Sequence, residues 1–136
     1  MLPKPEQAAS GAERRRFPRV DLDVAVELVG PEGGVWSLKS ANISRSGLQV
    51  RCPREAARDL VKECRRAAPN AADGHLGVRL GLEGTAGTSK RLTARARIVY
   101  ARPGSEDHYL IGLEFAGFEG DGYESLQAYI MECLRY

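Results

Sequence analysis

Alternating apolar and polar residues recur along most of the chain and predict β-strands. From Leu22 to Leu28 every second residue is apolar, and the residues between them are acidic or small. A period of two is typical of a strand with one buried face. The same alternation predicts five further strands, at 35–41, 48–52, 78–82, 92–100 and 109–115.

Turn-forming residues separate these six segments. Gly-Pro-Glu-Gly-Gly at 30–34 and Pro-Gly at 103–104 are typical turn sequences. Connections this short leave little room for crossover helices, so the strands are expected to pair in antiparallel fashion. Six short strands are enough to close a barrel, which removes the exposed edges of an open sheet. The pattern therefore predicts a mainly β fold, a six-stranded antiparallel barrel.

Two segments have helical rather than strand periodicity. Within 53–75, apolar residues recur every three or four positions as far as Ala68, and charged residues occupy the other side. Pro53 suits the first turn of a helix. The segment 123–136 has a second amphipathic pattern. The barrel is therefore expected to carry an inserted helix and a C-terminal helix packed on the sheet.

A dense cluster of arginines precedes the first strand. Four of the six residues from Arg14 to Arg19 are arginines, and they follow a polar tail at 1–12. Pro18 disfavours helix before it, so the stretch 13–19 is expected to be an extended loop. The fixed charges repel one another, whereas phosphates and guanine edges bind guanidinium groups in a bidentate manner. An anionic, acceptor-rich ligand is therefore the expected partner of this loop.

The polar stretch 42–47 separates the second and third predicted strands. The Asn42 side chain offers the acceptor that the N1 and N2 edge of guanine requires, and the Ser44 hydroxyl can donate or accept. Gly47 is expected to adopt a positive φ that a side chain would oppose. Because Asn, Ser and Gly are common turn residues, the stretch alone indicates only a turn. Arg45 is expected to be exposed.

Together, the two stretches resemble the PilZ family pattern, RxxxR followed by (D/N)xSxxG. Arg15 and Arg19 match the first motif, and the second is matched by Asn42, Ser44 and Gly47. The resemblance implies a PilZ-type barrel that binds cyclic di-GMP, a bacterial second messenger. By the family pattern, the two arginines grip phosphates and guanine. Asn42 and Ser44 contact a guanine, and Gly47 lets the backbone turn closely.

The resemblance covers a domain at 13–136. It includes the strand sequences Ala-x-Ile-Val-Tyr at 96–100 and Ile-Gly-Leu-Glu-Phe at 111–115. Two features depart from the usual pattern. The helical insertion at 53–75 is longer than a minimal PilZ domain requires, and Asn42 stands where aspartate is more frequent.

Arg14 directly precedes the first motif. In the PilZ family an arginine at this place is associated with capture of an intercalated pair of cyclic di-GMP molecules, whereas an apolar residue is associated with one molecule. A third guanidinium can offset phosphate repulsion and stack on an exposed guanine. The resemblance therefore implies two ligand molecules per chain, with Arg14 among their contacts.

Composition narrows the classes of function. The chain has 136 residues, enough for one domain, and a net charge of +2, which is too weak a field for duplex nucleic acid. Its three cysteines and two histidines lack metal-ligand spacing, so no metal or cofactor is expected beyond the ligand. No catalytic constellation is apparent, so an enzyme is not expected. The sequence has no signal-like segment and no apolar run that could span a membrane, which predicts a cytoplasmic protein with reduced thiols.

These observations favour a receptor whose mobile arginine loop folds over cyclic di-GMP and so regulates an unidentified downstream protein. Two alternatives remain open. A PilZ-like adaptor could act through protein contacts without binding a ligand, although intact motifs speak against it. A small β-barrel could bind single-stranded nucleic acid, but this would require basic and aromatic residues spread along one groove.

Overall fold

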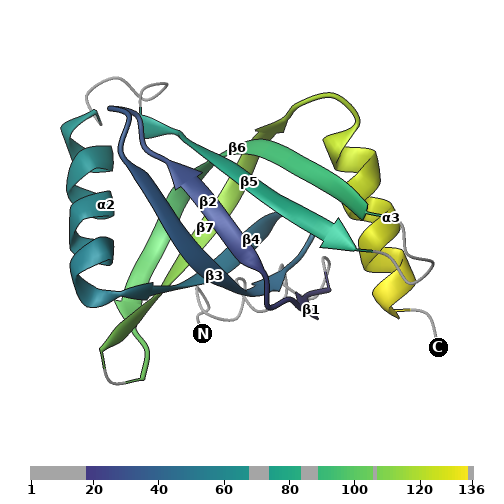
Figure 1. Ribbon diagram of the computed structural model, residues 1–136, viewed down its shortest axis with the longest axis horizontal. Coiled ribbons are helices and arrows are strands. Elements are labelled where there is room, and N and C mark those ends of the chain that lie inside the picture. The colour runs from purple at the N-terminus through teal and green to yellow at the C-terminus, as the bar shows by residue number, and fades with distance from the viewer. Residues whose placement is uncertain (1–17, 68–73, 84–88, 106, 135–136) are drawn as a thin grey trace, which may run out of the picture.

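The computed structural model describes residues 18–67, 74–83, 89–105 and 107–134. Within these ranges the chain forms seven strands and two helices (Figure 1). Their bounds are β1 (Val20–Asp21), β2 (Ala25–Val29), β3 (Val35–Ile43), β4 (Gly47–Pro53), α2 (Arg54–Arg66), β5 (Leu76–Glu83), β6 (Ser89–Pro103), β7 (His108–Phe118) and α3 (Gly122–Leu134). Neither of these two helices is long and apolar enough to cross a bilayer.

Strands β2 to β7 close into an antiparallel barrel. Around it the order is β3-β2-β5-β6-β7-β4, and β4 pairs back to β3 through Ile43↔Leu48. The short β1 pairs with the end of β3. Helices α2 and α3 lie at opposite ends of the barrel (Figure 1). The predicted six-stranded antiparallel barrel with an inserted helix and a C-terminal helix is therefore confirmed, and β1 adds one further strand.

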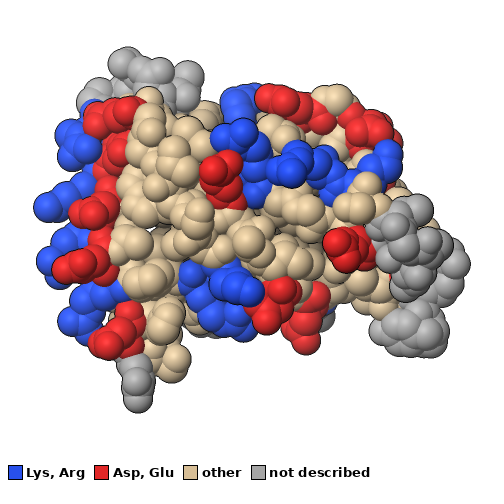
Figure 2. Space-filling view, viewed as in Figure 1, with Lys and Arg blue, Asp and Glu red and all other residues tan. Residues whose placement is uncertain are grey.

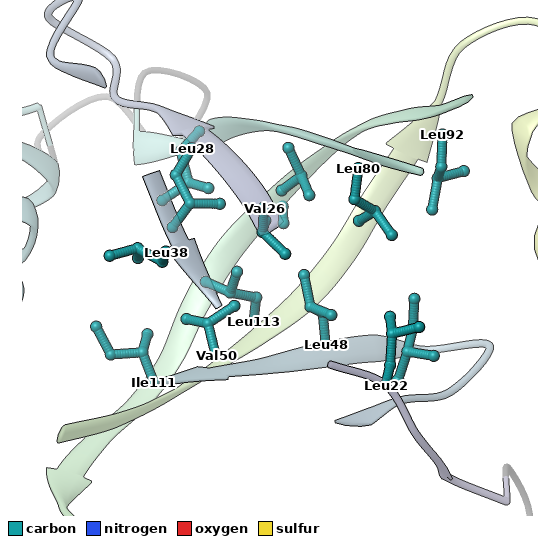
Figure 3. Close-up of a cluster of buried hydrophobic side chains, with 14 of the residues drawn as sticks. Leu22, Val26, Leu28, Leu38, Leu48, Val50, Leu80, Leu92, Ile111 and Leu113 are labelled. Carbon is teal, nitrogen blue, oxygen red and sulfur yellow. The ribbon is translucent and has the colours of Figure 1, made fainter. Parts of the chain in front are cut away.

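The alternating apolar residues of the strands point into the barrel and form its core (Figure 3). Val26 and Leu28 of β2 and Leu48 of β4 are almost inaccessible to solvent. Leu60 of α2 and Leu126 of α3 are fully buried in the same core, so each helix covers part of the barrel with one apolar face. Burial of each such side chain stabilises the fold by about 1.5–3 kcal/mol.

The first predicted strand, 22–28, is interrupted. The pairing of β1 ends at Asp21 and that of β2 begins at Ala25, and between them the chain is joined to β3 partly by backbone bonds and partly by the side chain of Ser40. The Ser40 hydroxyl donates to the Leu22 carbonyl at 2.6 Å and accepts from the Val24 N–H at 2.9 Å. Ser40 is fully buried, so these two bonds hold the bend without leaving a polar group unsatisfied.

Helix α2 is anchored to the turn between β2 and β3. The carboxylate of Glu63 is mostly buried, and its Oε2 accepts from the backbone N–H groups of Glu32 at 2.8 Å and Gly34 at 3.1 Å. On the surface, Arg66 and Glu32 form an ion pair at 2.9 Å. Residue Gly33 of this turn has a φ of 97°, which suits glycine. The inserted helix is therefore fixed at its C-terminal half.

The cysteines and histidines lie at different depths in the fold. Cys52 is fully buried in the core, and burial raises the pKa of its thiol to about 11. Cys64 and Cys133 are half-buried, and none of the three is in a disulfide. Of the two histidines, His108 is exposed and His75 is half-buried.

Candidate functional site

Strand β1 brings the two sequence motifs together. Its residues pair with the end of β3 through Val20↔Ile43 and Asp21↔Asn42. Arg19 directly precedes β1, and its Nη1 donates to Oδ1 of Asn42 at 2.6 Å, although 23 positions separate the two residues in sequence. The guanidinium of the first motif therefore contacts the amide of the second at the surface of the barrel.

A row of polar side chains continues from Asn42 across the outside of the barrel. The strand register aligns Asn42 of β3, Gln49 of β4, Gly112 of β7 and Tyr100 of β6. Nδ2 of Asn42 donates to Oε1 of Gln49 at 2.9 Å, and Nε2 of Gln49 donates to the Tyr100 hydroxyl at 2.6 Å. Gly112 leaves room for the row, because a Cβ at this position would overlap the Tyr100 ring. The guanidinium of Arg102 lies 5.0 Å from the centroid of that ring, in cation–π contact.

A cavity of about 470 Å³ opens beside this row. Asn42, Gln49, Asp21 and Arg51 line part of it. Nη1 of Arg51 donates to a backbone carbonyl of β3 at 2.9 Å, which orients its guanidinium. Small-molecule sites in proteins typically enclose about 300–1,000 Å³. The cavity combines guanidinium donors with amide and carboxylate acceptors, the groups that phosphates and a guanine edge require.

Sequence reasoning missed Gln49, Arg51 and Tyr100. Alternation places Gln49 and Arg51 on the outer face of the barrel. It assigns Tyr100 to the inner face together with Leu92 and Ala96, and the irregularity between Ile98 and Tyr100 turns Tyr100 outward. Alternation does not show which outward residues of different strands become neighbours. That depends on the pairing register, and here two irregularities shift it, between Ser40 and Asn42 and between Ile98 and Tyr100.

The hydroxyl of Ser44 serves the turn between β3 and β4. It accepts from the backbone N–H groups of Ser46 at 3.2 Å and Gly47 at 3.3 Å, and the side chain is 1% exposed. The backbone N–H of Ser44 donates to the Gly47 carbonyl at 2.9 Å. These bonds hold the shape of the turn beside Asn42. The expected contact between Ser44 and a guanine stays a prediction.

Gly47 is required for a reason other than the expected positive φ. Gly33 and Gly120 are the glycines in that conformation within the described residues, so the expectation for Gly47 was wrong. Gly47 is the first residue of β4 and pairs with Glu114 of β7. A Cβ at Gly47 would overlap the carbonyl oxygen of Leu113. The close approach of two backbones, not a left-handed conformation, therefore excludes a side chain here.

Arg45 also differs from expectation, because it is half-buried rather than exposed. Its Nη2 and Nε donate to the hydroxyl of Tyr123 at 3.0 and 3.3 Å. Tyr123 belongs to the first turn of α3, so Arg45 ties the turn between β3 and β4 to the C-terminal helix. This contact stabilises the turn that follows Asn42.

Several predicted site features lie outside the described residues. They are Arg14 and Arg15, the rest of the loop at 13–17, and the tail at 1–12. Of the predicted site, the structure therefore brings together Arg19 and Asn42 and places Ser44 and Gly47 in the adjoining turn. The predicted roles of Arg14 and Arg15 stay predictions.

Comparison with known proteins shows which family the chain belongs to. The family model described as the PilZ domain matches residues 13–132. The chain therefore belongs to the PilZ domain family. No curated protein sequence gives a significant match.

Solved structures with the same fold include three proteins of low sequence identity. The Bacillus subtilis inhibitor of motility, MotI/DgrA, has a TM-score of 0.61 at 18% identity, and the match covers 87% of this chain and 50% of that one. The complex of K. pneumonia MrkH with c-di-GMP has a TM-score of 0.52 at 18% identity, and the match covers 87% of this chain and 51% of that one. Borreliella burgdorferi PlzA in complex with c-di-GMP has a TM-score of 0.51 at 13% identity, and the match covers 99% of this chain and 60% of that one. The present chain thus spans about half to three-fifths of the length of these proteins.

Proposed function

We propose that this protein is a cytoplasmic receptor for cyclic di-GMP that regulates a downstream protein by changing its own surface on binding. The contact that carries the proposal joins Arg19 to Asn42 at 2.6 Å beside a cavity of about 470 Å³. Membership of the PilZ family supports it, as do the neighbours MrkH and PlzA, whose structures were solved with c-di-GMP.

The chemistry of the site suits the ligand. Guanine presents O6 and N7 as acceptors, which an arginine fork binds in a bidentate manner. Its N1 and N2 edge donates, and Oδ1 of Asn42 and the carboxylate of Asp21 are acceptors at the cavity. Arg19 contacts Asn42 in the present structure, so the ligand would replace one polar contact with two charge-assisted ones. Arg15, by the family pattern, joins Arg19 on the phosphates.

Two ligand molecules per chain are proposed because Arg14 precedes the first motif. A stacked pair of cyclic di-GMP molecules doubles the phosphate charge and exposes a further guanine face. A third guanidinium offsets part of the added phosphate charge and stacks on the exposed guanine face. Arg14→Leu is therefore expected to reduce the stoichiometry from two to one while binding persists.

The test compares matched arginine variants by calorimetry with cyclic di-GMP. One lost bidentate contact removes about 1–3 kcal/mol, so Arg19→Ala should weaken binding by roughly five- to 150-fold. Asn42→Ala should weaken it less, because a neutral hydrogen bond contributes less. Arg91→Ala removes the same charge from an exposed position on β6 and should leave the affinity unchanged. Equal affinity for Arg19→Ala and Arg91→Ala would contradict the assignment.

A further inference from the structure

A groove runs between α2 and β6. One part is a cavity of about 530 Å³ lined by Val61 and Cys64 of the helix and by Val99 and Ala101 of the strand, among others. A second cavity of about 230 Å³ shares Val61 and Ala101 with the first and extends toward Tyr109 of β7. The two cavities therefore adjoin at Val61 and Ala101, and together they are called the α2–β6 groove.

The floor of the α2–β6 groove is apolar and partly open to solvent. Val99 is 50% exposed. A shift in the pairing of β6 with β7 between Ile98 and Tyr100 leaves Val99 without a paired residue, as in a β-bulge. Bulges re-aim side chains and are frequent next to functional sites. Val99 therefore presents an apolar anchor point within a concave surface.

The helical rim of the α2–β6 groove is basic. Arg54, Arg58 and Arg65 line the two cavities, and their spacing of four and seven residues places them on one face of α2. All three are exposed, and none forms a salt bridge with another part of the chain that the structure describes. No described acidic residue lines either cavity. Along the outer edge of α2, basic side chains alternate with acidic ones (Figure 2), and it is the face toward the cavities that carries the three arginines.

We propose that the α2–β6 groove docks an acidic, amphipathic segment of a partner protein, whose apolar side chains cover Val99 and Val61 while its carboxylates face the arginines. Opposite charge favours this occupant. A second copy of the groove carries the same basic rim, and the chain's own stretch from Arg14 to Arg19 is also basic, so both are repelled. The apolar floor adds a contact that a purely electrostatic partner would not use.

The groove is connected to the proposed ligand site, and this part of the inference rests on the proposed function. Tyr100 lines the larger cavity, and its hydroxyl is the last acceptor in the row that starts at Arg19. When cyclic di-GMP binds the Asn42 amide, Gln49 loses the hydrogen bond that it accepts from Asn42. The Gln49 amide can then reorient, which changes its hydrogen bond to the Tyr100 hydroxyl. A partner that binds against Tyr100 then has a different affinity with and without ligand, which is an allosteric coupling.

The docking surface is tested with a displayed library of random 16-residue peptides, selected on the full chain without cyclic di-GMP and counter-selected on Val99→Glu. We expect enriched sequences to place acidic residues around leucine or aromatic anchors. A synthetic copy should bind at least tenfold more weakly to Val99→Glu and to Arg58→Glu. Val35→Glu and Arg91→Glu are matched controls, because Val35 is 56% exposed and Arg91 is exposed on β6, and neither lines the groove. No enrichment, or equal binding to all four variants, overturns the proposal.

The coupling is tested with the same peptide at saturating cyclic di-GMP. We expect its affinity for the parent to change at least threefold, and the change to be smaller in Tyr100→Phe, which keeps the ring and removes the hydroxyl. An unchanged peptide affinity in a parent that does bind cyclic di-GMP overturns the coupling alone. A parent that does not bind cyclic di-GMP overturns the proposed function, while the peptide selection still decides whether the groove is a docking surface.

Discussion

Replacing Gly47 by alanine should destabilise the barrel, because the new Cβ would overlap the carbonyl oxygen of Leu113. That oxygen belongs to the backbone of β7 and cannot rotate away, so the start of β4 must separate from β7. The separation also strains the bond from the Phe115 N–H to the Ser46 carbonyl, now 2.9 Å. Gly47 is the first residue of β4, so local fraying limits the cost. We estimate about 1–3 kcal/mol, the usual range for overpacking.

For a chain of this length, 1 kcal/mol corresponds to roughly 3–4 °C in Tm. The expected decrease for Gly47→Ala is therefore about 3–12 °C by thermal unfolding. Gly77→Ala is the matched control within a strand, since its Cβ would lie 3.7 Å from Cβ of Val29, an ordinary contact. Removing a flexible glycine there should raise stability by about 0.5–1 kcal/mol.

Gly47→Asn separates the two explanations for this glycine. Asparagine tolerates a positive φ better than alanine does, so a conformational requirement would make it the milder change. Close approach to β7 makes asparagine at least as damaging as alanine. If Gly47→Ala melts with the parent, or Gly47→Asn is clearly the more stable variant, the packing argument is refuted.

Three further predictions concern the bend, the inserted helix and a thiol. Ser40→Ala should cost about 2–4 kcal/mol in urea unfolding, because it leaves a half-buried N–H and a buried carbonyl without the Ser40 hydroxyl; a loss below 0.5 kcal/mol would contradict this. Glu63→Ala should cost about 1.5–3 kcal/mol by removing the acceptor of two backbone N–H groups. Asp59→Ala, exposed on the same helix, should change stability by less than about 0.5 kcal/mol, and equal effects would count against the anchor. Burial, with a smaller contribution from Glu63, raises the pKa of the Cys64 thiol to about 11, so the neutral thiol dominates at pH 8. Alkylation of Cys64 by iodoacetamide, followed by peptide mapping, should therefore accelerate nearly tenfold between pH 9 and pH 10; an increase of only about twofold, as for a thiol with an ordinary pKa, would refute the raised pKa.

The strands could be predicted from the sequence because their inward side chains alternate. Leu48, Val50 and Cys52 all face the core, as the alternation in 48–52 required. The break after Asp21 could not be predicted, because it depends on the Ser40 hydroxyl, which is distant in sequence and reaches the bend only once the barrel forms.

The candidate site was predictable in its motifs but not in its surroundings. Arg19 and Asn42 belong to recognisable patterns, and their contact agrees with them. Gln49 and Tyr100 join the row only because four strands pair in one register, and no local pattern specifies it. The role of Gly47 was misjudged for a similar reason, since the backbone that crowds it comes from a strand more than sixty residues later.

Calorimetric titration of the unmodified protein with cyclic di-GMP tests the central claim most directly. GMP and a single-stranded oligonucleotide serve as controls for a general affinity for guanine or phosphate. The account predicts saturable binding of cyclic di-GMP at two molecules per chain, with much weaker binding of both controls. Absence of saturable binding, or tighter binding of the oligonucleotide than of cyclic di-GMP, would contradict it.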